Sequence, residues 1–138
     1  EMGVAQIIPV QTDFTNSERI RADRLQNHAV EAAEQCGGTF VPKVLELQKL
    51  SRLLDTWGDR QIMFCDEELI GQPIMLPEIQ GPWAVLIGPE GGFSPAERMR
   101  LNAMLQGHPV PLGPRVLRSE TAVVAALTLW QTHIGDWR

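Results

Sequence analysis

The sequence has little of what marks several large classes of protein. Its two cysteines, Cys36 and Cys65, are too few for a disulfide framework or a CxxC metal site, and their apolar surroundings predict buried thiols. The three histidines are not spaced as metal ligands, so no metal site is expected. No run approaches the roughly 18 apolar residues of a membrane span, and no signal peptide opens the chain. We therefore expect a cytoplasmic protein without membrane contact.

Positive charge is also scarce. Twelve lysines and arginines stand against 17 aspartates and glutamates, which gives a net charge of −5. A chain of this charge lacks the basic footprint of a self-sufficient nucleic-acid binder, so local arginines or another domain would have to attract RNA or DNA. Neither phosphate-binding pattern, GxxxxGK[ST] or GxGxxG, occurs.

What the chain does have is an ordinary globular composition, with 43% hydrophobic and 21% charged residues in 138 positions. This length fits one domain. Apolar periodicity predicts strands over 4–10, 61–65, 83–87 and 110–112. It predicts helices over 18–36, 45–57, 94–106 and 119–134, with 66–80 as a surface connection. Strands that alternate with helices indicate an α/β domain with a mostly parallel sheet.

Three of these elements carry stronger signals. The segment 83–87 is apolar throughout, which is typical of a fully buried parallel strand. The helix over 94–106 begins with a capping box, in which Ser94 is the N-cap, Pro95 the first helical residue and Glu97 the third. The helix over 119–134 is apolar almost all round and is therefore expected to be buried.

Two loops rich in glycine and proline, 88–93 and 113–118, each follow a predicted strand and precede a helix. Ligands in parallel sheets bind beyond the carboxyl ends of the strands, so we predict that both loops form one small-molecule site. The first loop has three glycines, which let the backbone approach a ligand, but a tight turn would also explain them. It has no lysine, and Glu90 would repel a phosphate, so a neutral or cationic ligand is favoured.

The second loop carries two arginines, Arg115 and Arg118, three positions apart. Ser119, Glu120 and Thr121 then open the last helix. A polar cluster of this kind suits a binding loop, but an ordinary connection with arginines in solvent is an alternative interpretation.

Taken together, these segments resemble a known family. The stretches LIGPEGGFSPAE (86–97) and LGPRVLRSETA (112–122) look like the two signature motifs of the RsmE family, the 16S ribosomal RNA uridine N3-methyltransferases of the SPOUT superfamily. EMGVAQIIPV (1–10), EAAEQCG (31–37) and FCDEE (64–68) fit the same family in the same order. The resemblance extends from one end of the chain to the other.

The resemblance implies a SPOUT α/β domain over residues 1–138 with a deep C-terminal trefoil knot. It also implies S-adenosylmethionine as the cofactor, small-subunit ribosomal RNA as the substrate, and a homodimer with the substrate site between subunits. The N-terminal RNA-binding domain usual in the family is expected to be absent from this chain. S-adenosylmethionine has a cationic sulfonium and no phosphate, which agrees with a glycine loop that carries Glu90 and no lysine.

The resemblance also assigns site residues. The cofactor would be lined by Leu86, Ile87, Gly88, Pro89, Glu90, Gly91, Gly92, Leu112, Gly113, Val116, Leu117, Arg118 and Ser119. Uridine N3 must lose a proton on methylation, and the negative charge that develops on the base needs support. Our candidates are Arg118 for charge support and Glu90 or Glu120 as the proton acceptor.

Two other functions stay open. The chain could be a SPOUT RNA methyltransferase with a different target position or base. It could instead be a non-catalytic module that binds an adenosine-like ligand or serves only for dimerisation. Binding of S-adenosylmethionine would support either enzyme, whereas no binding to the folded chain would favour the non-catalytic module.

Overall fold

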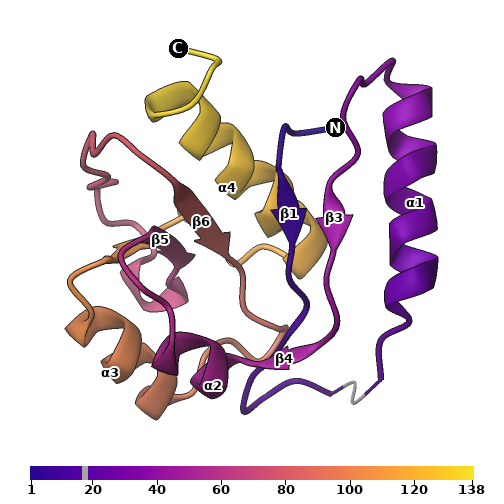
Figure 1. Cartoon of the computed structure of the whole chain (residues 1–138). Helices are drawn as coiled ribbons and strands as arrows, with labels where there is room; N and C mark the ends of the chain where they lie inside the picture. The colour runs from indigo at the N-terminus through magenta and orange to yellow at the C-terminus, as the bar shows by residue number, and fades with distance from the viewer. Residues whose placement is uncertain (17–18) are drawn as a thin grey trace.

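A computed structural model describes residues 1–16 and 19–138 of the chain. Its largest sheet has three parallel strands, with β5 (Gln61–Cys65) between β6 (Trp83–Leu86) and β7 (Gly107–Val110) (Figure 1). Phe64 of β5 stands opposite Leu86 of β6 and Pro109 of β7. Parallel neighbours need long crossover connections, and here they contain the 3-10 helix η1 (Glu67–Leu69) and the helix α3 (Pro95–Ala103).

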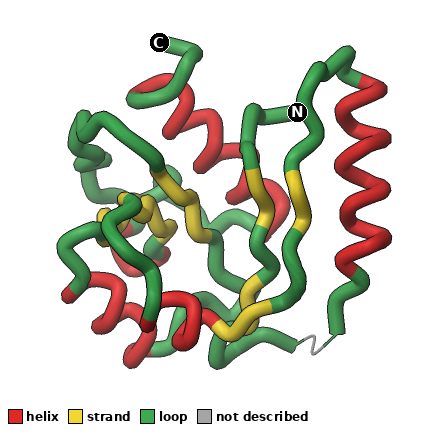
Figure 2. Tube along the Cα trace, in the orientation of Figure 1, coloured by secondary structure: helices red, strands yellow, loops and turns green. Residues whose placement is uncertain are grey.

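The N-terminal part of the chain forms two much shorter parallel ladders. In one, β1 (Gln6–Ile7) pairs with β3 (Lys43–Val44), and in the other β2 (Val10–Gln11) pairs with β4 (Gln48–Lys49). Figure 2 shows them as brief strand segments within long stretches of coil. The helix α1 (Ala22–Gln35) connects β2 to β3. It lies along β3, away from the three-stranded sheet (Figure 1).

The core lies on both faces of β5, because successive side chains of a strand point to opposite sides. Ile62 and Phe64 pack on one face against α2 (Leu50–Asp55), α3 and Phe93. Met63 packs on the other face, together with Val110 of β7 and Ala126 of α4 (Ser119–His133). The sheet is therefore covered on each side by a helical layer, and the prediction of an α/β fold with parallel strands is confirmed.

Several predicted elements are found close to their expected bounds. β5 covers the predicted 61–65, and α4 ends one residue before the predicted 134. The capping box of α3 is confirmed: Ser94 Oγ accepts a hydrogen bond from the Glu97 N–H at 3.2 Å, and the Ser94 N–H donates to the Glu97 carboxylate at 2.9 Å.

Other boundaries were predicted wrongly. The strand expected over 4–10 is divided into β1 and β2, since Pro9 has no N–H to donate to a ladder. The helix expected over 45–57 is limited to α2, because residues 48–49 pair with β2. α3 stops at Ala103 and not at 106, and β7 covers 107–110 in place of 110–112.

The first helix begins at Ala22 and not at the predicted Glu18, which itself lies outside the described residues.

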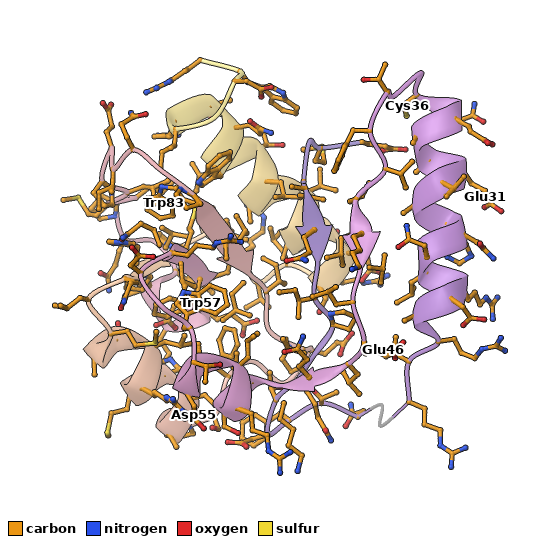
Figure 3. All side chains as sticks on the ribbon, in the orientation of Figure 1. Glu31, Cys36, Glu46, Asp55, Trp57 and Trp83 are labelled. Carbon is orange, nitrogen blue, oxygen red and sulfur yellow. The ribbon has the colours of Figure 1, made fainter. Side chains whose placement is uncertain are left out.

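Three expectations about burial are also wrong for this chain. Cys36 is exposed, because it is the C-cap residue beyond the last turn of α1, where Figure 3 labels it. The residues of β6 are half-buried and not fully buried. On α4, Ala122 and Ala126 face the core, but Val123 and Val124 are 39% and 54% exposed, since only one side of the helix meets the sheet. None of the described helices is both long enough and apolar enough to span a bilayer.

Candidate functional site

A cavity of about 180 Å³ lies beyond the carboxyl ends of the three parallel strands. Each strand leads into one wall: β5 ends at Cys65 and is followed by 66–70, residues 87–93 follow β6, and residues 112–119 follow β7. Parallel strands end at the same edge of a sheet, which is why segments far apart in sequence meet here. The structure thus brings together the two loops that the sequence singled out, and it adds a third.

Nine of the sequence-predicted cofactor residues line this cavity. They are Ile87, Gly88, Pro89, Gly91, Gly92, Leu112, Val116, Leu117 and Ser119. The remaining predicted residues stand outside the lining as far as the chain is described: Leu86, Glu90, Gly113, Arg118 and Glu120. Leu86 packs against the core, while the side chains of Glu90, Arg118 and Glu120 are exposed to solvent.

The shape of the glycine loop depends on a tight turn. The Gly92 N–H donates to the Pro89 carbonyl at 2.8 Å, and Gly92 has a φ of +71°, a conformation that favours glycine. Phe93 anchors the end of the turn in the core, where its ring meets the edge of Phe64 at 6.4 Å between centroids. A Cβ on Gly88 would approach the Phe93 ring at 3.3 Å. The interpretation of the glycines as a tight turn is therefore confirmed, and the same glycines also line the cavity.

A hydrogen bond joins the two predicted loops. Ser119 Oγ, at the start of α4, donates to the Gly88 carbonyl at 3.4 Å. Gly113 in the second loop has a φ of +95°, and a Cβ there would meet no other described atom within 4 Å. Glycine is therefore favoured at position 113 by the backbone conformation of the turn, and not by a steric clash that a larger side chain would cause.

The third wall of the cavity is held by an ion-pair cluster that the sequence analysis missed. Asp66, which is buried, accepts hydrogen bonds from Arg98 Nε at 3.1 Å and Nη2 at 2.9 Å. Arg98 Nη1 also pairs with the Glu68 carboxylate. The hydrogen bond with Asp66 raises the pKa of the Arg98 guanidinium above its ordinary value. Because Arg98 belongs to α3, the cluster ties η1 to the helix that follows the glycine loop.

Two charged side chains of the lining differ from this cluster. No hydrogen bond or ion pair within the described part of the chain engages the side chains of Glu67 and Arg115. The Glu67 carboxylate lies across the cavity wall from the glycine turn, with Oε2 at 3.9 Å from where a Cβ on Gly92 would stand. Sequence reasoning placed Arg118 at the site, whereas Arg115 is the arginine of that loop that lines the cavity.

Cys65 also reaches the cavity, at the end of β5. Burial raises the pKa of its thiol to about 12, because a thiolate would be poorly solvated there. The side chain is therefore a neutral, apolar part of the wall at physiological pH, and not a nucleophile. The described residues contain no group of three or more acidic, histidine or cysteine side chains placed to hold one metal ion.

The chemistry of the walls indicates what the cavity can hold. Ile87, Leu112 and Leu117 offer apolar surface, and the glycine turn offers backbone groups at close range. The charged side chains of the lining are Asp66, Glu67, Glu68, Arg98 and Arg115, of which Asp66 and Glu68 already bind Arg98. Such a site fits a ligand with an apolar or aromatic part and a polar part.

Comparisons with known proteins show which family this chain is similar to. A family model described as an RNA methyltransferase domain matches residues 1–131. The ribosomal RNA small subunit methyltransferase E of Buchnera aphidicola (from Acyrthosiphon pisum) is 30% identical over 100% of this chain and 57% of its own length. The protein of that name from Bacillus subtilis is 31% identical over 99% of this chain and 60% of its own.

A solved structure is similar as well. The ribosomal RNA small subunit methyltransferase E from Neisseria gonorrhoeae, bound to S-adenosyl methionine, superposes with a TM-score of 0.85 at 29% identity. The match covers 99% of this chain and 58% of that one. The chain therefore spans less than two thirds of the length of these relatives.

Proposed function

We propose that this chain, which belongs to the RNA methyltransferase domain family, binds S-adenosylmethionine in the cavity described above and methylates small-subunit ribosomal RNA. The observation that carries the proposal is the meeting of the two motif loops, 87–93 and 112–119, at one cavity. The similar structure from Neisseria gonorrhoeae, which holds S-adenosyl methionine, supports the choice of cofactor.

The residues of the cavity fit this cofactor. S-adenosylmethionine supplies an activated methyl group on a sulfonium, together with an adenine, a ribose and an amino acid. Ile87, Leu112 and Leu117 would pack against the adenine, and backbone groups of the glycine turn would bind its edge. The cofactor has no phosphate, which is consistent with described walls in which three carboxylates outnumber two guanidinium groups.

Residues outside the lining would act on the RNA base. We propose uridine N3 as the target atom, which must lose its proton when it is methylated. Arg118 would support the negative charge on the base, and Glu90 or Glu120 would accept the proton. All three side chains are exposed beside the loops that line the cavity, so they are accessible to a base that approaches from solvent.

The domain would be a SPOUT methyltransferase domain over residues 1–138, with a C-terminal trefoil knot. The contact between Ser119 at the start of α4 and Gly88 in the preceding motif supports a close association of these two segments. The net charge of −5 implies that other parts of the assembly attract the RNA. The reaction would take place in the cytoplasm, where ribosomes assemble.

The active unit would be a homodimer. Val123 and Val124 of α4 expose apolar surface that a second copy could cover.

Two measurements test the proposal. Isothermal titration calorimetry with the folded chain should detect binding of S-adenosylmethionine and S-adenosylhomocysteine, and no binding of either would contradict it. Assembled small ribosomal subunits and free ribosomal RNA, both lacking the modification, are then incubated with chain and donor. Nucleoside mass spectrometry should detect 3-methyluridine, whereas another methylated nucleoside would indicate a different target.

The roles of the exposed residues need separate variants. Arg118→Ala should lose most methyl transfer while it binds S-adenosylmethionine as the unmodified chain does, because its side chain lies outside the cavity lining. Glu90→Gln and Glu120→Gln should identify the proton acceptor by the same criterion. Full activity in both glutamine variants would exclude both residues as the base.

A further inference from the structure

The walls of the cofactor cavity carry more negative than positive charge. Three carboxylates, from Asp66, Glu67 and Glu68, stand against two guanidinium groups, from Arg98 and Arg115. Cys65 adds no charge, since its thiol stays protonated at neutral pH. The lining therefore bears one net negative charge.

This charge is not spread evenly over the walls. Asp66 and Glu68 both bind Arg98, and each is therefore largely compensated by a cation in contact with it. Glu67 lies between them in sequence, but no described residue pairs with its side chain. It is thus the carboxylate of the lining that remains available to a ligand.

The backbone at Glu67 is held in place by its neighbours. It is the first residue of η1, and Asp66 caps that helix by accepting a hydrogen bond from the Glu68 N–H at 3.1 Å. Asp66 is in turn held by Arg98 of α3 through two hydrogen bonds. The Glu67 carboxylate faces Gly92, so it borders the space that the glycine turn leaves open.

We infer that Glu67 makes the cavity select a cationic ligand over a neutral one, so that the methyl donor binds more tightly than the demethylated product. The inference rests on the proposed function. S-adenosylmethionine carries a sulfonium, an ammonium and a carboxylate, which leave one net positive charge. S-adenosylhomocysteine lacks the sulfonium charge and is neutral overall. The negative lining therefore attracts the donor more than the product, which favours exchange of product for new donor after each turnover.

Arg115 opposes this preference. It lines the same cavity and reduces the negative charge that a ligand meets there. Glu67 and Arg115 are thus expected to change the selectivity in opposite directions when they are neutralised. Both are solvent-exposed, so each effect should be modest, about threefold in the ratio of dissociation constants.

The test is a calorimetric titration of S-adenosylmethionine and S-adenosylhomocysteine into four proteins: the unmodified chain, Glu67→Gln, Arg115→Gln and Glu78→Gln. The quantity of interest is the Kd of S-adenosylhomocysteine divided by that of S-adenosylmethionine. We expect this ratio to fall about threefold in Glu67→Gln and to rise about as much in Arg115→Gln. Glu78→Gln removes the same charge from an exposed position outside the cavity lining and should leave the ratio unchanged.

The outcomes separate the inference from the proposed function. If neither ligand binds the folded, unmodified chain, the proposed function fails. If both bind and the ratio is the same in Glu67→Gln, or moves in one direction in both cavity variants, only the inference is overturned. A structural role for Glu67 would weaken both ligands together and leave their ratio constant. Salt gives a measurement without any variant, because raising it from about 0.05 M to about 0.5 M should lower the ratio of the unmodified chain.

Discussion

The N-terminal region, with β1–β4 and α1, buries its side chains far less than the C-terminal region that begins at β5. In β5, Ile62, Met63 and Phe64 are at most 1% exposed, whereas α1 leaves Leu25 and Val30 more than a third exposed. The ladders of the N-terminal region are two residues long, and those of the C-terminal sheet are four. The better-packed region therefore supports the cavity, since all three of its walls follow strands of the C-terminal sheet.

The largest expected effect comes from the centre of the C-terminal core. Phe64→Ala should lower the free energy of unfolding by about 3–5 kcal/mol, because it leaves a cavity among residues that cannot collapse to fill it. It should also weaken binding of S-adenosylmethionine, since Phe64 supports Phe93 at the end of the glycine turn. Urea unfolding followed by circular dichroism measures the first effect, and calorimetry measures the second.

The matched variant in the other region is Val30→Ala on α1. Its side chain is 37% exposed, so the loss should be below about 1 kcal/mol, with donor binding unchanged. Equal losses in the two variants would contradict the difference in packing between the regions.

A smaller effect is expected from the ion pair between Asp66 and Arg98. Asp66→Asn leaves Arg98 with the exposed Glu68 as its remaining carboxylate, so we expect a loss of about 2 kcal/mol in unfolding free energy. The comparison is Asp23→Asn, which breaks the solvent-exposed pair of Arg21 and Asp23 on α1 and should have no measurable effect on the urea midpoint. A large effect in Asp23→Asn would show that α1 depends on its surface charges.

Helix capping distinguishes the two regions further. Ser94→Ala removes the cap of α3 and its hydrogen bond to the Asp13 carboxylate, and should cost about 1 kcal/mol in thermal or urea unfolding. In α1, the N-cap position is Arg21, whose side chain makes no capping hydrogen bond within the described residues. Arg21→Ser should therefore raise the urea midpoint. A decrease would mean that Arg21 does more for α1 than a serine cap can.

The sequence predicted the two loops of the site because their signals are local. A short window of sequence is enough to reveal both the three glycines among the six residues 88–93 and the capping box that begins at Ser94. Their meeting at one edge followed from the rule that parallel strands end together. The third wall has no such local signal. Asp66 and Arg98 are 32 positions apart, and only the packing of α3 beside η1 brings them into contact.

The errors in the N-terminal region have a related cause. Local apolar pattern predicted one strand over 4–10 and a helix from 45, but pairing with distant residues decided both, since Val10 stands opposite Gln48. Exposure was misjudged for Cys36 and for one side of α4, because an apolar sequence does not specify which side meets the sheet. Arg115 and Arg118 are three positions apart, and the sequence gives no signal that Arg115 is the one whose side chain lines the cavity.

The smallest expected effect is a pH dependence at the opposite end of the sheet. His108 of β7 is half-buried, with its Nε2 at 2.7 Å from Gln61 Oε1 and its ring 5.0 Å from that of Trp83. Burial lowers the pKa of His108 below its ordinary value of 6.5, because the charged imidazolium would lose solvation.

The unfolded chain therefore takes up a proton at His108 at a higher pH than the folded chain does. Neutral His108 therefore makes its full contribution to the free energy of unfolding above pH 6.5. This contribution falls as the pH decreases through that value, until the lower pKa of the folded state is passed. Urea unfolding at a series of pH values should show this slope, and His108→Gln should reduce it. His28→Gln, at an exposed position of α1, is the matched control and should keep the slope of the unmodified chain. If His28→Gln flattens the slope and His108→Gln does not, the titrating group belongs to the N-terminal region instead.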